Sequence, residues 1–73
     1  MEKLGRAVYE FRVKALLTEE RAKWFENLTA TAEDNGETLL RGVIQDQAAL
    51  HGVLAKIRDL GLPLLKVERL PPC

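Results

Sequence analysis

The sequence predicts an α+β fold, and two observations carry that prediction. The hydrophobic period changes along the chain in the order strand, helix, strand, strand, helix, strand. The dipeptide Asn35-Gly36, a strong signal for a hairpin turn, separates the two middle strands. This order is that of the ferredoxin-like βαββαβ sandwich, in which a four-stranded antiparallel sheet carries two helices on one face.

The first strand and first helix are expected between residues 7 and 27. Apolar and charged residues alternate over residues 7–15, and Tyr9 and Phe11 lie on the apolar face. Thr18 is a suitable N-cap for the helix, which we expect to run to about Asn27. Trp24 and Phe25 are adjacent in this helix, so we expect one of them in the centre of the core and the other at its border.

The second and third strands are expected over residues 28–33 and 38–44, with two possible registers. A two-residue turn would set Ala32 opposite Leu39 and bring Arg41 to the core face. A longer or bulged turn would instead direct the side chains of Leu40, Gly42 and Ile44 inward. We expect the longer turn, because it keeps the charge of Arg41 out of the core. In the second strand, the inward residues are expected to be Leu28, Ala30 and Ala32.

The second helix and last strand complete the expected fold. Asp46 is a suitable N-cap, and Gly61 followed by Pro63 ends the helix. An apolar stripe at helical spacing is formed by Leu50, Val53, Leu54, Ile57 and Leu60. The last strand is expected at about residues 62–70, with Leu65 and Val67 facing inward.

Length and composition indicate one small domain that tends to self-associate. We expect a lead at residues 1–5, the fold over residues 6–70 and a tail at residues 71–73. A 73-residue chain builds only a small core, which oligomerisation often supplements. Eleven basic and eleven acidic residues cancel, which argues against nucleic acid or an anionic membrane as a partner. The single cysteine, Cys73, and the lack of a signal peptide or bilayer-length apolar stretch make a cytoplasmic location the default expectation.

The sheet face without helices is the first candidate for a functional surface. Strand alternation places charges of both signs and an aliphatic minority there. The candidate interface residues are Val8, Leu39, Val43 and Leu64. We expect a homodimer formed by this face or by a sheet edge. The alternatives are an ordinary solvated face and an RNA-binding face. The RNA-binding alternative is disfavoured because Tyr9 and Phe11 lie on the opposite side of the first strand.

The residues that could carry chemistry are few. No metal site or catalytic residue is expected, because there is one histidine and no serine. We also expect no cofactor. A small-molecule pocket between the two helices is a second hypothesis, with Trp24, Gln47 and His51 as its candidate ligand-binding residues. On that hypothesis the protein would be a small-ligand sensor or a minor enzyme.

Two segments of the chain resemble known sequences. Residues 46–52, DQAALHG, and residues 57–62, IRDLGL, are similar to segments of short bacterial proteins of uncharacterised function. The resemblance implies a free-standing bacterial domain and assigns no activity. The first functional hypothesis is therefore a non-enzymatic, self-associating interaction or regulatory module.

Overall fold

Four strands and two helical segments follow one another in the computed structural model, which describes residues 6–25 and 27–71. In chain order they are β1 Ala7–Val13, α1 Glu19–Ala22, a 3₁₀ turn η1 Lys23–Phe25, β2 Thr29–Ala32, β3 Thr38–Ile44, α2 Gln47–Asp59 and β4 Leu64–Arg69. The expected lead at residues 1–5 and the last two residues of the expected tail, Pro72 and Cys73, lie outside the described residues.

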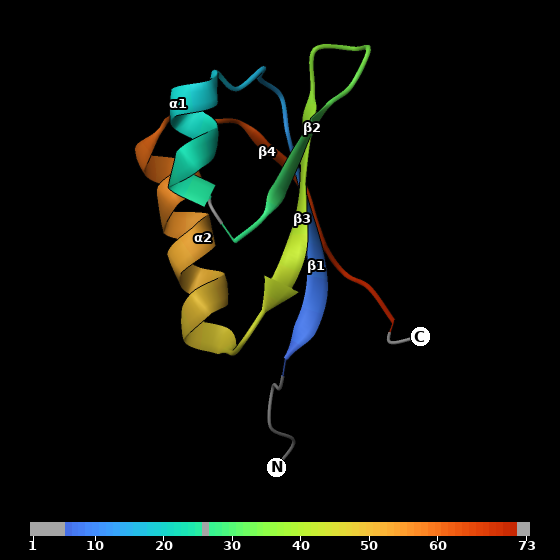
Figure 1. Cartoon of the computed structure of the whole chain (residues 1–73), viewed down its shortest axis with the longest axis vertical. Coiled ribbons are helices and arrows are strands. Elements are labelled where there is room, and N and C mark those ends of the chain that lie inside the picture. Colours follow the sequence, from blue (N-terminus) through green and yellow to red (C-terminus); the bar gives the residue numbers. More distant parts are fainter. Residues whose placement is uncertain (1–5, 26, 72–73) are drawn as a thin grey trace.

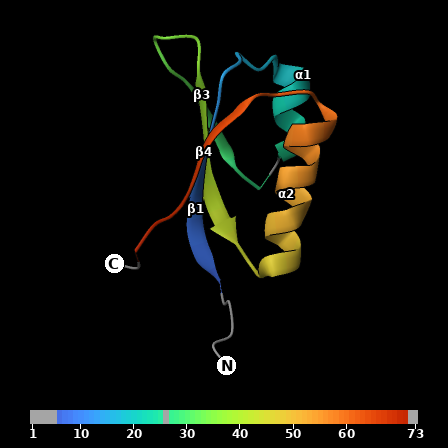
Figure 2. The ribbon, with the colours of Figure 1, turned by 180° about the vertical axis from the view of Figure 1, so that it is seen from behind.

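The strands form one open sheet in the order β2-β3-β1-β4, and every pair of neighbours is antiparallel. Both helices lie on the same side of the sheet, and no helix or strand of the described residues lies on the other side (Figures 1 and 2). The predicted α+β class, with a four-stranded antiparallel sheet and two helices, is confirmed.

The core lies between this sheet and the helices. Phe11 and Leu40 are fully buried side by side, because they are paired residues of β1 and β3. Tyr9 stacks on Phe11 with ring centroids 6.2 Å apart. Ile57 of α2 is buried in the same core and is contributed by the helical layer. The alternation in the first strand therefore predicted its buried face correctly.

The hairpin between β2 and β3 has the longer of the two turns considered. Ala32 pairs with Thr38, which leaves a five-residue loop, residues 33–37, between the strands. Gly36 adopts a φ of 82° in this loop, a conformation that glycine tolerates best. The resulting register buries Leu40 and leaves Arg41 exposed, as predicted.

The second helix also has the predicted ends. The side chain of Asp46 accepts a 2.8 Å hydrogen bond from the backbone N–H of Ala49, which caps the first turn. Gly61, with a φ of 70°, follows the last turn, and the backbone N–H of Leu62 returns to the carbonyl oxygen of Ile57.

The first helix is shorter than predicted. Regular α-helix ends at Ala22, and the chain tightens into the 3₁₀ turn instead of continuing to Asn27. This turn buries Phe25, whereas its neighbour Trp24 is 49% exposed. The backbone N–H of Leu28 then bonds the carbonyl oxygen of Phe25, so the chain turns at once into β2. The helix is short because the chain must bury Phe25 and then turn into β2 within a few residues.

Two predicted inward faces are not buried. Ala30 and Ala32 of β2 are exposed, because the short α1 leaves a hollow of about 410 Å³ over this edge strand. Leu65 and Val67 of β4 are 48% and 39% exposed, although Val67 pairs with the buried Phe11. β4 is the other edge strand and is exposed along its length.

Candidate functional site

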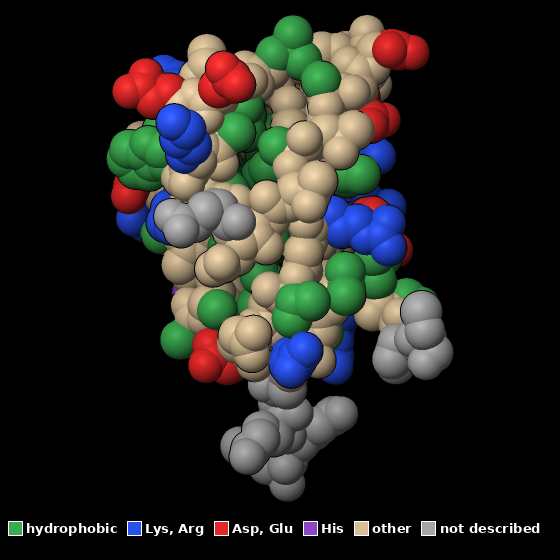
Figure 3. All heavy atoms as spheres, viewed as in Figure 1, with side chains coloured by type: hydrophobic (Ala, Val, Ile, Leu, Met, Phe, Trp, Pro, Cys, Tyr) green, Lys and Arg blue, Asp and Glu red, His purple; other side chains and the backbone are tan. Residues whose placement is uncertain are grey.

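The open face of the sheet is a surface that none of the described helices or strands covers. Strand register places residues from β1, β3 and β4 on it in rows that run across the strands. Figure 3 views the sheet edge-on, and both acidic and basic side chains are seen at the side away from the helices. The sequence predicted this mixed composition, but the rows depend on which strands are neighbours.

Two adjacent rows on the open face bring like charges directly opposite each other. In one row Glu10 of β1 pairs with Glu68 of β4. In the next row Arg12 of β1 pairs with Lys66 of β4. Like charges in directly opposed cross-strand positions disfavour a sheet. We call the row of Glu10 and Glu68 the acidic row, although Arg41 of β3 also lies in it opposite Glu10, and the row of Arg12 and Lys66 the basic row.

Ion pairs within the chain relieve part of this repulsion. Arg41 Nη1 lies 3.6 Å from Glu10 Oε2, and Lys66 Nζ lies 3.3 Å from Glu68 Oε1. All four side chains remain partly exposed, so water weakens these attractions.

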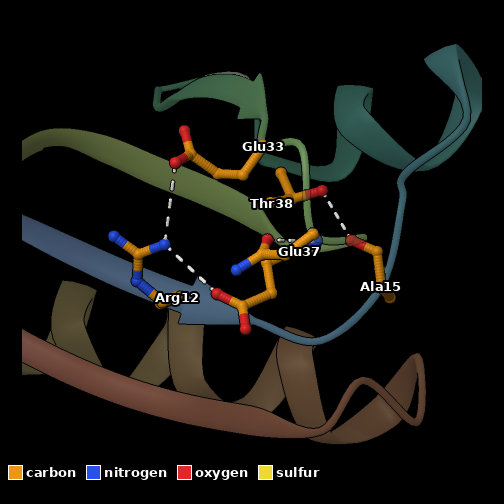
Figure 4. Close-up of polar contacts among 6 residues, drawn as sticks. Arg12, Ala15, Glu33, Glu37 and Thr38 are labelled. Carbon is orange, nitrogen blue, oxygen red and sulfur yellow. Dashed lines mark hydrogen bonds and ion pairs between the residues drawn. The ribbon is translucent and has the colours of Figure 1, made fainter.

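Arg12 forms ion pairs with two carboxylates of the loop between β2 and β3. Its Nη1 lies 3.2 Å from Glu37 Oε1 and 3.8 Å from Glu33 Oε1, between the two carboxylates (Figure 4). The loop after β2 thus fixes the position of one cation in the basic row.

Three of the four candidate interface residues lie on the open face beside these rows, and Leu64 does not. Val8 and Val43 are paired across β1 and β3 and share the open face, and Val43 is 40% exposed. Leu39 is half-buried opposite Arg12. Leu64 is 41% exposed but lies opposite the core residue Val13, because the register between β1 and β4 shifts there.

The candidate ligand-binding residues lie on the helical side. Gln47 and His51 are exposed one turn apart on α2, and Trp24 is exposed on η1. Lys56 links these segments, because its Nζ donates a 2.9 Å hydrogen bond to the carbonyl oxygen of Trp24. The hollow of about 330 Å³ between α2 and the start of β2 is lined by residues such as Gly52 and Lys56, and not by Trp24, Gln47 or His51.

A third hollow was not predicted from the sequence. It lies where β1 begins and where β3 and β4 end, and its volume is about 300 Å³. Its lining residues are Arg6, Ala7, Val8, Arg41, Val43, Arg69, Leu70 and Pro71. Three segments far apart in the sequence supply the arginines, so only the strand order reveals that they converge.

Two further observations concern metals and membranes. Within residues 6–25 and 27–71, no three side chains of His, Cys, Asp or Glu are grouped as they would be around a metal ion. No helix in this part of the chain is both long and apolar enough to cross a lipid bilayer.

These features define a small α+β domain with an uncovered antiparallel sheet. The chain belongs to the family described as a domain of unknown function, DUF8691, which matches residues 8–68 and so extends from β1 into β4. Comparison with curated proteins and with solved structures found no match. The family description names no activity.

Proposed function

We propose that this protein is a small, non-enzymatic interaction module that forms a homodimer through the open face of a ferredoxin-like sheet. The strand order supports the ferredoxin-like arrangement, because α1 and α2 each connect two strands that are separated by a third. The resemblance to short bacterial proteins and the single cysteine support a cytoplasmic bacterial protein.

The observation that carries the proposal is the pair of charged rows. Consider a second copy placed face to face, with the two-fold axis running across the strands between the rows. That operation sets the acidic row of each copy against the basic row of the other. Glu68 then faces the partner's Lys66, and Glu10 faces the partner's Arg12. A two-fold contact must be self-complementary, and these four charged positions support such a contact.

Apolar residues on the same face supply the attraction that charge pairing alone does not. Val8, Leu39 and Val43 adjoin the charged rows, and burying them against a second copy removes apolar surface from water. A chain of this length has a small core of its own, so burial between copies adds a substantial share of stability.

A pair of single charge reversals on the edge strand tests this arrangement. In a homodimer of Glu68→Lys, two basic side chains face each other at each contact between positions 68 and 66. In a homodimer of Lys66→Glu, two acidic side chains face each other there. Each variant alone is therefore expected to be mainly monomeric. In a mixture of the two, both contacts between the copies become attractive, so a mixed dimer is expected. With one of the two variants labelled uniformly with ¹⁵N, native mass spectrometry of the mixture distinguishes the mixed dimer from either homodimer.

The control for this experiment is Arg58→Glu, which changes an exposed charge at the end of α2, away from the open face. It is expected to dimerise as the unmodified chain does. Two results would oppose the proposal: homodimers of both reversed variants as tight as those of the unmodified chain, or a mixture that forms no mixed dimer.

A further inference from the structure

The hollow at the end of the sheet has a basic rim. Arg6 precedes β1, Arg41 belongs to β3 and Arg69 ends β4, and all three line the same space of about 300 Å³. Among the described residues, the only carboxylate paired with any of these arginines is that of Glu10, 3.6 Å from Arg41. The hollow is therefore locally positive in a chain whose formal net charge is zero.

The walls between these arginines are apolar. Val8 and Val43 are paired neighbours on the open face, and Leu70 lies beside Val8, whose carbonyl oxygen accepts a 2.8 Å hydrogen bond from the Leu70 N–H. Pro71 completes this side of the hollow. A ligand body placed on these apolar side chains displaces water, and exclusion of water strengthens the attraction between a guanidinium group and an anion.

Guanidinium groups and apolar walls together favour a ligand that has an anionic group at one end and an apolar body at the other. Arginine binds carboxylate and phosphate groups through paired N–H donors, which a neutral or cationic group cannot accept in the same way. Binding sites for small molecules combine apolar walls with a few placed polar groups, and this volume is at the lower end of their range. We propose that the hollow binds a small organic anion, a carboxylate or phosphate group attached to a short apolar body.

A series of probes with the same six-carbon chain tests the proposal. The unmodified protein is titrated with hexanoate, hexyl phosphate, hexanol and hexylammonium, and binding is followed by the amide NMR shifts of each residue. We expect at least one of the two anions to bind at least tenfold more tightly than hexanol or hexylammonium. The shifts are expected in the residues that line the hollow, and the tighter anion identifies the preferred head group.

Variants of the rim separate the arginines from the walls. Arg6→Gln and Arg69→Gln are each expected to weaken binding of the preferred anion at least fivefold. Arg58→Gln on α2 is the matched control and is expected to leave binding unchanged. Comparison of anion and cation on the unmodified chain needs no variant, so the test holds even if a substitution disturbs folding.

Three results would overturn this inference: equal binding of hexanol and the anions, shifts that lie away from the hollow, or unchanged binding in a variant that lacks both Arg6 and Arg69. The inference concerns a single chain, although Val8 and Val43 also belong to the proposed dimer face. The titration is therefore repeated with Lys66→Glu, which is expected to be mainly monomeric and keeps all three arginines. Shifts are assigned residue by residue in whichever oligomeric state the protein adopts, and a failure of the charge-reversal experiment leaves this titration interpretable.

Discussion

The hydroxyl group of Thr38 donates a 2.6 Å hydrogen bond to the carbonyl oxygen of Ala15 (Figure 4). Thr38 begins β3 and is 2% exposed, and Ala15 follows β1 in the loop that leads to α1. Thr38 is the one buried polar residue among the described residues. This hydrogen bond therefore links the loop before α1 to the start of β3.

Thr38→Val removes this hydrogen bond while keeping the shape of the side chain. The carbonyl oxygen of Ala15 loses its partner in a partly buried site, so we expect the free energy of unfolding to fall by about 1–2 kcal/mol. Urea denaturation measures the change. Thr31→Val on the exposed edge strand is the control, with an expected change within about 0.5 kcal/mol. Equal stability of the Thr38 variant and the unmodified chain would show that the bond does not matter.

Two glycines are expected to respond to alanine in opposite directions. A Cβ at Gly42 in β3 would lie 2.6 Å from the carbonyl oxygen of Asn27 and 2.7 Å from Leu28 Cδ2, so the chain must shift. Gly42→Ala is expected to destabilise the fold by about 1–3 kcal/mol. At Gly52, inside α2, a Cβ would meet nothing within 4 Å. Gly52→Ala is expected to stabilise the fold by up to about 1 kcal/mol, because alanine favours helix.

Thermal unfolding of the two glycine variants gives the comparison. A higher melting temperature for Gly42→Ala would contradict the close approach of the chain before β2 to β3. A lower one for Gly52→Ala would mean that the helix surface at this position is not open.

The cap of α2 gives a third stability prediction. Asp46→Ala removes the acceptor for the Ala49 N–H and is expected to cost about 1 kcal/mol. Asp59→Ala, at the other end of the same helix, removes an exposed carboxylate that pairs only with the adjacent Arg58 in the described structure. Its expected effect is within about 0.5 kcal/mol. Guanidinium denaturation of both variants measures the difference, and equal losses would argue against the cap.

Local signals in the sequence predicted much of the fold. The Asn35-Gly36 turn, the Asp46 cap and the alternation around Phe11 are each determined by neighbouring residues, and the structure confirms them. The predicted length of the first helix was wrong. Val67 faces inward opposite Phe11, as predicted, but it stays 39% exposed because the helices cover little of this edge strand.

The candidate site could be predicted only in part, for a related reason. Alternation alone placed Val8 and Val43 on the open face, as the register shows. The acidic and basic rows require β4 to lie beside β1, and the basic hollow requires the ends of three strands to meet. Neither relationship is encoded in a local pattern, so each becomes visible only when the strands are paired.

Introducing a charge among the apolar residues of the open face is expected to weaken the dimer. Val43→Asp places a carboxylate where the proposed interface buries apolar surface, and burying an unpaired charge is costly. Leu16→Asp is the control, because Leu16 is 62% exposed beside α1 and not on the open face. Sedimentation velocity is expected to show a higher dimer dissociation constant for the Val43 variant, and an unchanged one for the Leu16 variant. Equal dissociation of both variants would remove the open face from the interface.

The central claim is that two copies of the chain pair through the open face, and the solution mass tests it most directly. Light scattering coupled to size-exclusion chromatography is run over a series of protein concentrations, with and without reductant. We predict a mass twice that of one chain, unchanged by reductant, because the contact does not require Cys73. A mass that stays at that of one chain up to the highest concentration would contradict the proposal.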